Sequence, residues 1–460
     1  MAKRIVFTTP VKSFNSIVSP LGENDSRVAI CRAGTCSRPG RSELLFQDWF
    51  HARKNRLPMS RLGGMDCPVF VEVMPRGVTR PRDTSWVTAA IREAQLPRAA
   101  YLALVIDGTS MQAYGWYFER GEYQPIDVLS LPGPRMLKLA VQPAPPLSIP
   151  VEQRRSRQQP TEQLDEHPEK AEQLDRLIMS VGEGDRARGE QRVLAAMALE
   201  RVIVVGAGRA GLLLLLYLVK SGIARSGEIV VIDGDMVEEV NRDAMLLPPG
   251  AVGRPKAEAA AIIAQGFFPE ARVVPVVATL SDAVAADMVA TSDVVFTCVD
   301  QDATRVGAAA IAARYHRVHF DLAGGGAYTA DRRAVFGGEV RLWVPGSDGC
   351  VACLGDPDWE RIRRQLSDDA ESERYLRQAS DPARERPGSS EPLLHMVLGT
   401  AMQTFWRLIS GDQNESCWFH LDANGPLPVW SDWTDQRAGG RCPVCSDDGL
   451  VGAGDWGQSW

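Results

Sequence analysis

The chain has 460 residues, of which 45% are hydrophobic and 24% charged, a composition typical of a globular protein with two or three domains. Its net charge of -7 argues against a protein that binds nucleic acid through phosphate contacts. The most apolar run, residues 212–219, is far shorter than the roughly 20 residues that cross a bilayer, and no signal-peptide pattern follows the N-terminus. Nine cysteines, an odd number, lead us to expect a cytoplasmic protein whose thiols bind metal or react instead of forming disulfides.

The first 140 residues alternate short apolar runs, such as 69–71 and 101–106, with a helical stretch near 86–94. This pattern predicts a small α+β domain over residues 1–140. Residues 141–172 are rich in proline, glutamine and charge, and they contain almost no aromatic or β-branched side chains. Such a segment buries too little apolar surface to fold alone, so we expect a flexible linker.

After the linker, strand-like and helix-like segments alternate over residues 173–446, and residues 447–460 are expected to form a C-terminal tail. The alternation predicts a doubly wound, mainly parallel α/β sheet. The expected strands are 202–205, 229–232, 272–277, 294–298 and 317–321. The expected helices are 211–220, 255–265, 281–290 and 302–314. Residues 355–388 are expected to form an exposed helical or loop segment before an apolar helix over 393–408.

A glycine-rich turn follows the first of these strands. Gly206, Gly208 and Gly211 open the next helix, where glycines allow a tight turn, close approach of backbone N–H groups to phosphate, and close packing of helix on strand. The following strand ends at Asp233 and Asp235, about 20 residues on, where a carboxylate accepts hydrogen bonds from ribose. The pattern predicts a nucleotide site, and the alternative is that the glycines only permit packing.

Two Cys-x-x-Cys pairs lie further along the chain. Cys350 and Cys353 form the first pair, and Cys442 and Cys445 form the second. Four thiolates with this spacing supply a tetrahedral Zn²⁺ site. We therefore expect zinc to tie the end of the chain to the body of its domain.

Four motifs, taken in order, resemble the adenylation domain of the ThiF family. They are the glycine turn, the run from Asp233 to Asn241, the Gly-Arg-Pro-Lys sequence at 253–256, and the run from Cys298 to Arg305. That family comprises ubiquitin-activating enzymes and bacterial activators of sulfur-carrier proteins. Its bacterial members hold a structural zinc where the cysteine pairs fall. The resemblance covers about residues 173–446 and implies a Rossmann-like domain that uses ATP and Mg²⁺.

The resemblance also implies roles for single residues. The implied nucleotide contacts are Asp233 and Asp235 at the ribose end, Asn241 and Lys256 at the phosphates, and Asp300 at Mg²⁺. Lys256 is alternatively a solvated residue of a first helical turn, and Asp300 a helix N-cap. Asp302 is a cap or a catalytic group with equal weight. Positioning and electrostatic stabilisation supply most of the catalysis when a carboxylate attacks ATP.

Three arginines bear on this site. Arg176 lies where the family has a short helix whose arginine reaches the nucleotide site of a neighbouring protomer, and the alternative is an exposed arginine with no role. The family usually places an arginine three residues after the asparagine, but Ala244 stands there and Arg242 is the nearest arginine. Arg209 replaces a common glycine, and its charge would either hold the phosphates or block them.

Family members that pass their substrate on as a thioester carry a cysteine between the zinc pairs. Residues 354–416 contain none, and Cys417 is the only thiol left between the pairs. Its place before a strand-like run favours a buried structural cysteine, and Cys298 is expected to be structural as well. We therefore expect the chemistry to stop at the acyl adenylate, with the transfer thiol on a partner.

The N-terminal domain is similar in layout to JAB/MPN deubiquitinase-type domains, in which His-x-His-Pro and Ser-x-x-Asp build a zinc site. The matching positions hold Glu72, Met74, Arg82 and Ser85. Methionine is a poor Zn²⁺ ligand and serine lacks a carboxylate, so no catalytic zinc is expected. The layout predicts an inactive peptidase fold kept for binding, with an unrelated α+β domain as the alternative.

Three functions remain open from the sequence. The first is an ATP-dependent adenylyltransferase that activates the C-terminal carboxylate of a ubiquitin-like or sulfur-carrier-like protein. It would act as a homodimer in a bacterial conjugation pathway, beside a separate conjugating protein. The second is a non-catalytic scaffold, favoured by Ala244 and the missing thiol. The third, a nicotinamide-dependent oxidoreductase, is disfavoured because it does not require Lys256, Asp300 and zinc together.

Overall fold

The chain forms two compact units, which are described separately. Unit 1 comprises Met1–Gln159, Arg314–His316 and Leu450–Trp460, and unit 2 comprises Pro160–Ala313 and Arg317–Gly449. No helix in the described part is both long and apolar enough to span a bilayer. The computed structural model describes residues 4–19, 21, 27–38, 41–54, 57–65, 67–74, 81, 84–107, 110–132, 137–144, 168–223, 227–245, 247–329, 333–347, 349–354, 359–365, 388–413, 415–435, 442–446 and 449–455.

Unit 1 is built on one sheet, whose strand order in the described residues is β5-β4-β2-β3-β1-β8-β9-β6-β7. An additional pairing between β5 and β6 closes eight of these strands into a ring, with β7 attached outside it. The strands are β1 (Arg4–Thr8), β2 (Arg27–Arg38), β3 (Arg41–Arg53), β4 (Pro68–Val73), β5 (Arg98–Asp107), β6 (Ser110–Glu119), β7 (Glu122–Pro125), β8 (Val128–Leu131) and β9 (Leu137–Pro143).

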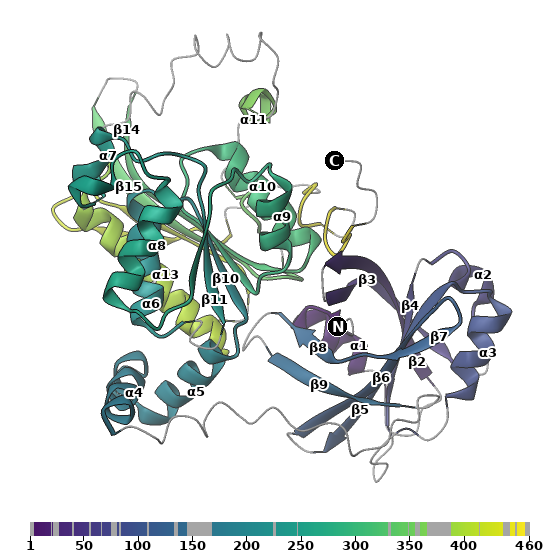
Figure 1. Ribbon diagram of the computed structural model, residues 1–460. Helices are drawn as coiled ribbons and strands as arrows, with labels where there is room; N and C mark the ends of the chain where they lie inside the picture. The colour runs from purple at the N-terminus through teal and green to yellow at the C-terminus, as the bar shows by residue number, and fades with distance from the viewer. Residues whose placement is uncertain are drawn as a thin grey trace. The chain divides into compact units, whose positions relative to one another are not determined.

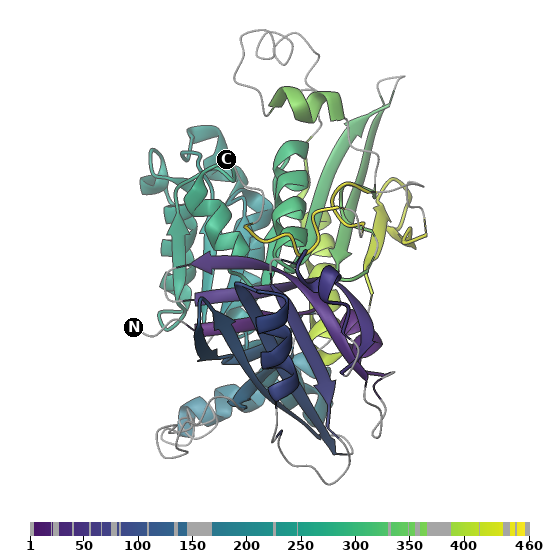
Figure 2. The same ribbon diagram turned by 90° about the vertical axis from the view of Figure 1, so that its right-hand side faces the viewer.

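Alternating side chains give this ring two separate cores. Buried apolar side chains from all eight ring strands form one cluster, together with Phe14 and Ile17 of α1 (Val11–Val18). The opposite faces of β2, β4, β5 and β6 pack on α2 (Met59–Leu62) and α3 (Ser85–Glu93). Figure 2 shows α3, in dark blue, against the outside of the sheet. A shift of one residue in any strand would exchange its two faces, so burial fixes the register.

The positions compared with a peptidase zinc site gather no set of ligands in the described residues. Glu72 of β4 is buried and pairs with Lys54, and Met74 is buried in the outer cluster. Ser85 is the first residue of α3, and Arg82 lies outside the described residues. The likeness to JAB/MPN domains stays a prediction.

Two segments at the predicted boundaries take part in unit 1. β9 continues into the stretch expected to be a linker, where Val141 pairs with Ala113. Residues expected to form a C-terminal tail also belong to this unit, because Asp455 accepts hydrogen bonds from the Ser37 amide at 2.9 Å and the Tyr315 hydroxyl at 2.7 Å. Ser37 and Tyr315 lie far from Asp455 in the sequence, so the composition around Asp455 does not predict these contacts.

Unit 2 contains an eight-stranded sheet in the order β12-β11-β10-β13-β14-β15-β16-β17. The strands from β12 to β14 pair in parallel, and β15, β16 and β17 extend the sheet with antiparallel pairing. This confirms the doubly wound, mainly parallel fold. The strands are β10 (Arg201–Val205), β11 (Glu228–Ile232), β12 (Val273–Val276), β13 (Val294–Thr297), β14 (Val318–Tyr328), β15 (Ala334–Trp343), β16 (Cys417–Asp422) and β17 (Val429–Asp432).

Helices cover both faces of this sheet. Figure 1 shows α6 (Arg209–Lys220), α8 (Lys256–Phe267) and α13 (Glu391–Ser410) on one face, with α9 (Ala283–Ala290) and α10 (Asp302–Arg314) on the other. Burial from both sides explains the continuous valine and isoleucine runs of β10 and β11 and the fully buried β13. The other helices among the described residues of this unit are α4 (Pro168–Val181), α5 (Arg186–Met197), α7 (Glu239–Ala244), the 3-10 turn η4 (Pro249–Ala251) and α11 (Trp359–Gln365).

Candidate active site

The glycine turn joins β10 to α6, and each of its three glycines has a different surrounding. Gly206 has φ +93°, and a Cβ there would lie 2.8 Å from the carbonyl oxygen of Cys298. A Cβ on Gly211 would lie 1.8 Å from the carbonyl oxygen of Gly206. A Cβ on Gly208 would meet nothing within 4 Å. Gly206 and Gly211 are therefore required by the turn itself, whereas Gly208 leaves backbone open to a ligand.

A pocket of about 900 Å³ lies at this turn. It opens at the carboxyl ends of β10, β11 and β13, where the helices after β10 and β13 leave on opposite faces of the sheet. Ligands of doubly wound sheets bind at this switch point. The pocket brings together Gly206, Gly208, Asp233, Asp235, Lys256 and Asp300, all of which the sequence predicted for a nucleotide site.

Asp233 is held at the end of β11 by backbone amides. Its carboxylate accepts hydrogen bonds from the Ala207 amide at 2.7 Å and the Asp235 amide at 2.8 Å. Burial raises the pKa of Asp233 above its ordinary value, while the two amide donors and the nearby Lys256 act in the opposite direction. Each carboxylate oxygen has a second lone pair, so the group can still accept from a ribose hydroxyl.

Lys256 begins α8 and lies over the pocket. Its Nζ is 2.8 Å from a carboxylate oxygen of Asp235. The Lys256 side chain is 15% exposed, but that of Asp235 is 74% exposed. Because the Asp235 carboxylate is well hydrated, its ion pair with Lys256 is weak. The Lys256 ammonium group therefore remains available to a phosphate.

The pocket has four carboxylates, and Asp300 differs from the other three. Asp233 accepts from two amides, Asp235 pairs with Lys256, and Glu339 pairs with Arg341. Asp300, at the exposed end of β13, makes no hydrogen bond or ion pair with any described residue. An unpaired carboxylate at the mouth of the pocket is suited to a hard divalent cation.

Asn241, Arg176 and Asp302 are not among the described residues that line the pocket. Asn241 caps α7, where its side-chain oxygen accepts from the Glu238 amide at 3.2 Å. Arg176 is an exposed residue of α4, and Asp302 is the first residue of α10. The Arg242 side chain lies outside the described residues. Their roles at a nucleotide stay predictions.

A buried charged cluster, which the sequence did not indicate, underlies the pocket. Asp321 of β14 is 1% exposed and accepts from Arg305 at 2.7 and 2.8 Å, from Arg341 at 3.1 Å and from the Thr297 hydroxyl at 2.7 Å. Burial opposes its ionisation, but the two arginines lower the pKa of Asp321 to about 2. Burial lowers the pKa of the adjacent His319 to about 4. Asp321 thus holds Arg305 in place at the pocket wall. Asp321 itself belongs to none of the sequence motifs.

The far half of the pocket is lined by glycines of paired strands. Gly324 and Gly325 of β14 lie opposite Gly338 and Gly337 of β15, within the green hairpin of Figure 2. A Cβ on Gly338 would lie 2.3 Å from the Val397 side chain, so α13 packs directly against the backbone of this hairpin. The result is a glycine-rich stretch of the pocket lining in which backbone of both strands is exposed between larger residues such as Phe336.

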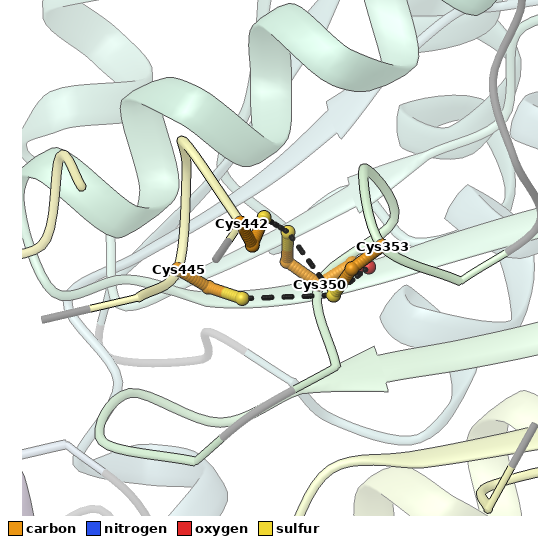
Figure 3. A group of neighbouring side chains, drawn as sticks. All are labelled: Cys350, Cys353, Cys442 and Cys445. Atoms are coloured by element: carbon orange, nitrogen blue, oxygen red, sulfur yellow. Dashed lines mark hydrogen bonds between the residues drawn. The ribbon is translucent and has the colours of Figure 1, made fainter. Parts of the chain in front are cut away.

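The four paired cysteines converge, as the sequence predicted. Their sulfur atoms all lie within 4.8 Å of one another (Figure 3). The Sγ atoms are separated by 3.6 Å between Cys350 and Cys442, 3.7 Å between Cys353 and Cys445, and 4.0 Å between Cys350 and Cys353. A tetrahedral zinc with Zn–S bonds of about 2.3 Å requires sulfur separations of about 3.8 Å, so the donor set fits zinc.

Two other cysteines near the sheet are poor nucleophiles. Cys417, at the start of β16, is buried, and burial raises its pKa to about 12. Burial likewise raises the pKa of Cys298, at the pocket edge, to about 12. A thiol acts as a nucleophile through its thiolate, which is scarce at neutral pH in both.

Comparisons with known proteins agree with this geometry. The family model described as "ThiF family" matches residues 175–443, more than half of the chain. The SAMP-activating enzyme E1 of Haloferax volcanii is 39% identical over 118 residues, which cover 25% of this chain and 41% of that enzyme. The sulfur carrier protein ThiS adenylyltransferase of Escherichia coli is 28% identical over 263 residues, 56% of this chain and 88% of that enzyme.

Solved structures include similar folds. The crystal structure of E. coli MccB with ATP matches 60% of this chain and 74% of that chain, with a TM-score of 0.44 and 17% identity. Among the relatives matched by sequence, the chain spans less than half the length of the SAMP-activating enzyme.

Proposed function

The chain belongs to the ThiF family, and from this premise we propose that it is an ATP-dependent adenylyltransferase. Its substrate would be the C-terminal carboxylate of a small ubiquitin-like or sulfur-carrier protein. The names of two relatives, a SAMP-activating enzyme and a ThiS adenylyltransferase, support this class of substrate. The observation that carries the proposal is a pocket in which a phosphate-binding turn, Lys256 and the unpaired Asp300 meet.

Each side of the pocket has a defined task in this reaction. Backbone N–H groups around Gly208, at the start of α6, would bind phosphate oxygens together with Lys256. Asp233 would orient the ribose. The substrate carboxylate oxygen then attacks the α-phosphorus, and the bond to the β-phosphate oxygen breaks as pyrophosphate leaves with its electron pair. Fixed donors around the phosphates stabilise the charge that develops in the transition state.

Asp300 fits the Mg²⁺ that such a reaction uses. Its exposed carboxylate has no partner among the described residues, and oxygen is the ligand that Mg²⁺ prefers. Bound Mg²⁺ would supply positive charge beside the phosphates. The remaining coordination would come from phosphate oxygens and water, because Mg²⁺ keeps several waters and takes few protein ligands.

The glycine-lined half of the pocket would take the end of the substrate chain. Bare backbone on Gly325 and Gly337 leaves room for an extended segment with small side chains. Such a segment would bring its terminal carboxylate toward the nucleotide half. This arrangement favours a protein with a narrow C-terminus over a small-molecule acid or a nicotinamide substrate.

We further propose that the chemistry stops at the acyl adenylate. Cys417 and Cys298 are deprived of thiolate by burial, and residues 354–416 contain no cysteine. A separate conjugating protein would then supply the transfer thiol, in keeping with a bacterial conjugation pathway. If incubation with ATP, Mg²⁺ and a carrier gives a reducible adduct that Cys417→Ala removes, this part of the proposal is wrong.

A homodimer is the assembly that we propose. Arg176 is exposed on α4 and is not among the described residues that line the pocket of its own chain, so in this proposal another copy would bring it to a nucleotide. Arg176→Ala should then reduce turnover without changing the substrate contacts made within one chain. Light scattering tests the dimer directly, and mixed dimers of Arg176→Ala with Asp300→Asn should recover part of the activity.

Pyrophosphate–ATP exchange is the experiment that tests the main proposal. Wild-type protein should exchange label only with Mg²⁺ and a carrier protein, tested over a panel of purified ubiquitin-like and sulfur-carrier proteins. Asp300→Asn should abolish the exchange and leave the melting temperature unchanged, because the side chain is exposed and unpaired in the described structure. Glu360→Gln, an exposed change on α11, is the matched control. ATP binding without any exchange would favour the scaffold alternative.

A further inference from the structure

Arg209, the first residue of α6, is turned toward the segment Gly388–Ser390, here called the strap. Its Nη1 donates a hydrogen bond to the carbonyl oxygen of Ser389. On the other side, the Gly326 amide donates to the carbonyl oxygen of Gly388 at 2.8 Å. Gly388 and Ser389 both line the pocket. The strap is thus tied to the phosphate-binding turn at one end and to the glycine hairpin at the other.

The place of Arg209 is not explained by the stability of α6. A cation in the first turn of a helix is opposed by the helix dipole, which favours anions there. No carboxylate pairs with Arg209 in the described structure, and its one bond is to a neutral carbonyl. A guanidinium group has five donors and binds phosphate oxygens more strongly than neutral acceptors. An anion at the N-terminus of α6 would therefore interact favourably with the helix dipole and accept hydrogen bonds from the Arg209 guanidinium group.

The strap itself is held in an incompletely satisfied arrangement. The Oγ of Ser389 is buried and has no hydrogen-bond partner among the described residues. A buried polar group without a partner costs free energy. The strap would therefore relax if the Arg209 bond were released.

We propose that Arg209 is a further phosphate-binding residue of the nucleotide site, with two positions. In the empty site its guanidinium binds the Ser389 carbonyl. When ATP is bound, the same group contacts the terminal phosphates and releases the strap beside the glycine-lined half. The inference rests on the proposed nucleotide site, and it resolves the alternatives for Arg209 in favour of holding the phosphates. It also makes access to the far half of the pocket depend on bound nucleotide.

Calorimetric titration with Mg²⁺ and ATP, and separately with AMP, tests the phosphate contact. Arg209→Ala should weaken ATP binding by at least about tenfold, as expected for loss of a charge-assisted hydrogen bond, and should leave AMP binding nearly unchanged. Arg209→Lys keeps the charge but has a single donor group. Its affinity for ATP should therefore lie between those of wild type and Arg209→Ala. Arg272→Ala, which removes an exposed arginine at the start of β12, is the matched control and should bind both nucleotides like wild type.

Hydrogen exchange tests the release of the strap. The Gly326 amide, which is bonded to Gly388, should exchange faster when ATP is added to wild type but not when AMP is added. In Arg209→Ala it should exchange fast without nucleotide. If wild type does not bind ATP, the proposal of a nucleotide site is itself wrong. Normal or tighter ATP binding by Arg209→Ala, an equal loss for ATP and AMP, or a Gly326 amide indifferent to ATP in wild type would each overturn the role of Arg209 alone.

Discussion

Asp321→Asn is the substitution that most directly tests the buried cluster beneath the pocket. The pKa of Asp321 is about 2 instead of 3.8, so its ionised form gains about 2 to 3 kcal/mol from folding. Asparagine has nearly the same shape but leaves Arg305 as a buried cation without its carboxylate, while Arg341 keeps its pair with Glu339. Removing one member of a buried ion pair costs about 3 to 5 kcal/mol. We therefore expect the free energy of unfolding of unit 2 to fall by that amount at pH 7.

The same carboxylate predicts a pH dependence. Its pKa is lower in the folded protein, so its contribution to stability is complete above the unfolded value near pH 4. The contribution is lost as the pH falls toward about 2, because protonation then breaks the pairs with the arginines. Wild type should lose stability over this interval by more than Asp321→Asn, which has no such proton to bind.

Urea unfolding from pH 7 to pH 2.5, with hydrogen exchange of β13 and β14 amides to report unit 2 alone, measures both effects. Glu360→Gln is the control. Glu360 of α11 also accepts from two arginines, Arg363 and Arg364, which lower its pKa to about 2, but solvent surrounds it. Its loss should not measurably change stability, because exposed pairs are screened. Equal effects of the two substitutions at pH 7 would refute the reasoning.

Two further changes test the metal cluster and the glycine turn. Purified protein should contain about one zinc per chain, and Cys442→Ser should lose it while Cys417→Ser keeps it, as measured by metal analysis. Gly211→Ala should lower the melting temperature strongly, because its Cβ would lie 1.8 Å from the Gly206 carbonyl oxygen. Gly208→Ala should melt like wild type but bind ATP more weakly, since its Cβ enters open space. If both alanine variants lose stability equally, Gly208 has a structural role.

The α/β core of unit 2 was predictable because its signals are local. Uninterrupted valine and isoleucine strands, separated by helix-length segments, allow only a few arrangements of a parallel sheet. The one strand boundary that was badly wrong is that of β14, which was expected to end at 321 but continues to Tyr328. Gly324, Gly325 and Gly326 resemble a break in the strand. They are instead paired with β15, and a Cβ on Gly324 would lie only 3.0 Å from Leu394 of α13.

Long-range pairing could not be predicted in the same way. The closure of the unit 1 ring depends on β5 pairing with β6 while β6 also pairs with β9, and no residue type announces such a choice. The contribution of Asp455 to unit 1 depends on Ser37, more than 400 positions earlier in the chain. The β5–β6 pairing and the Asp455 contact both depend on surfaces that fit together in three dimensions, and these cannot be recognised in a single sequence.

Asp300 and Asp321 illustrate why motifs reveal only part of a site. Asp300 follows β13, Asp321 lies in β14 at the end of its parallel pairing with β13, and each lies within or beneath the same pocket. Asp300 was predicted from the family resemblance of the motif around it, and its lack of any partner in the described structure suits it to a ligand. The charge of Asp321 is already neutralised by two arginines. An exposed carboxylate without a partner can bind a ligand, whereas a buried and fully paired carboxylate holds its neighbours in place, and only three-dimensional contacts distinguish the two.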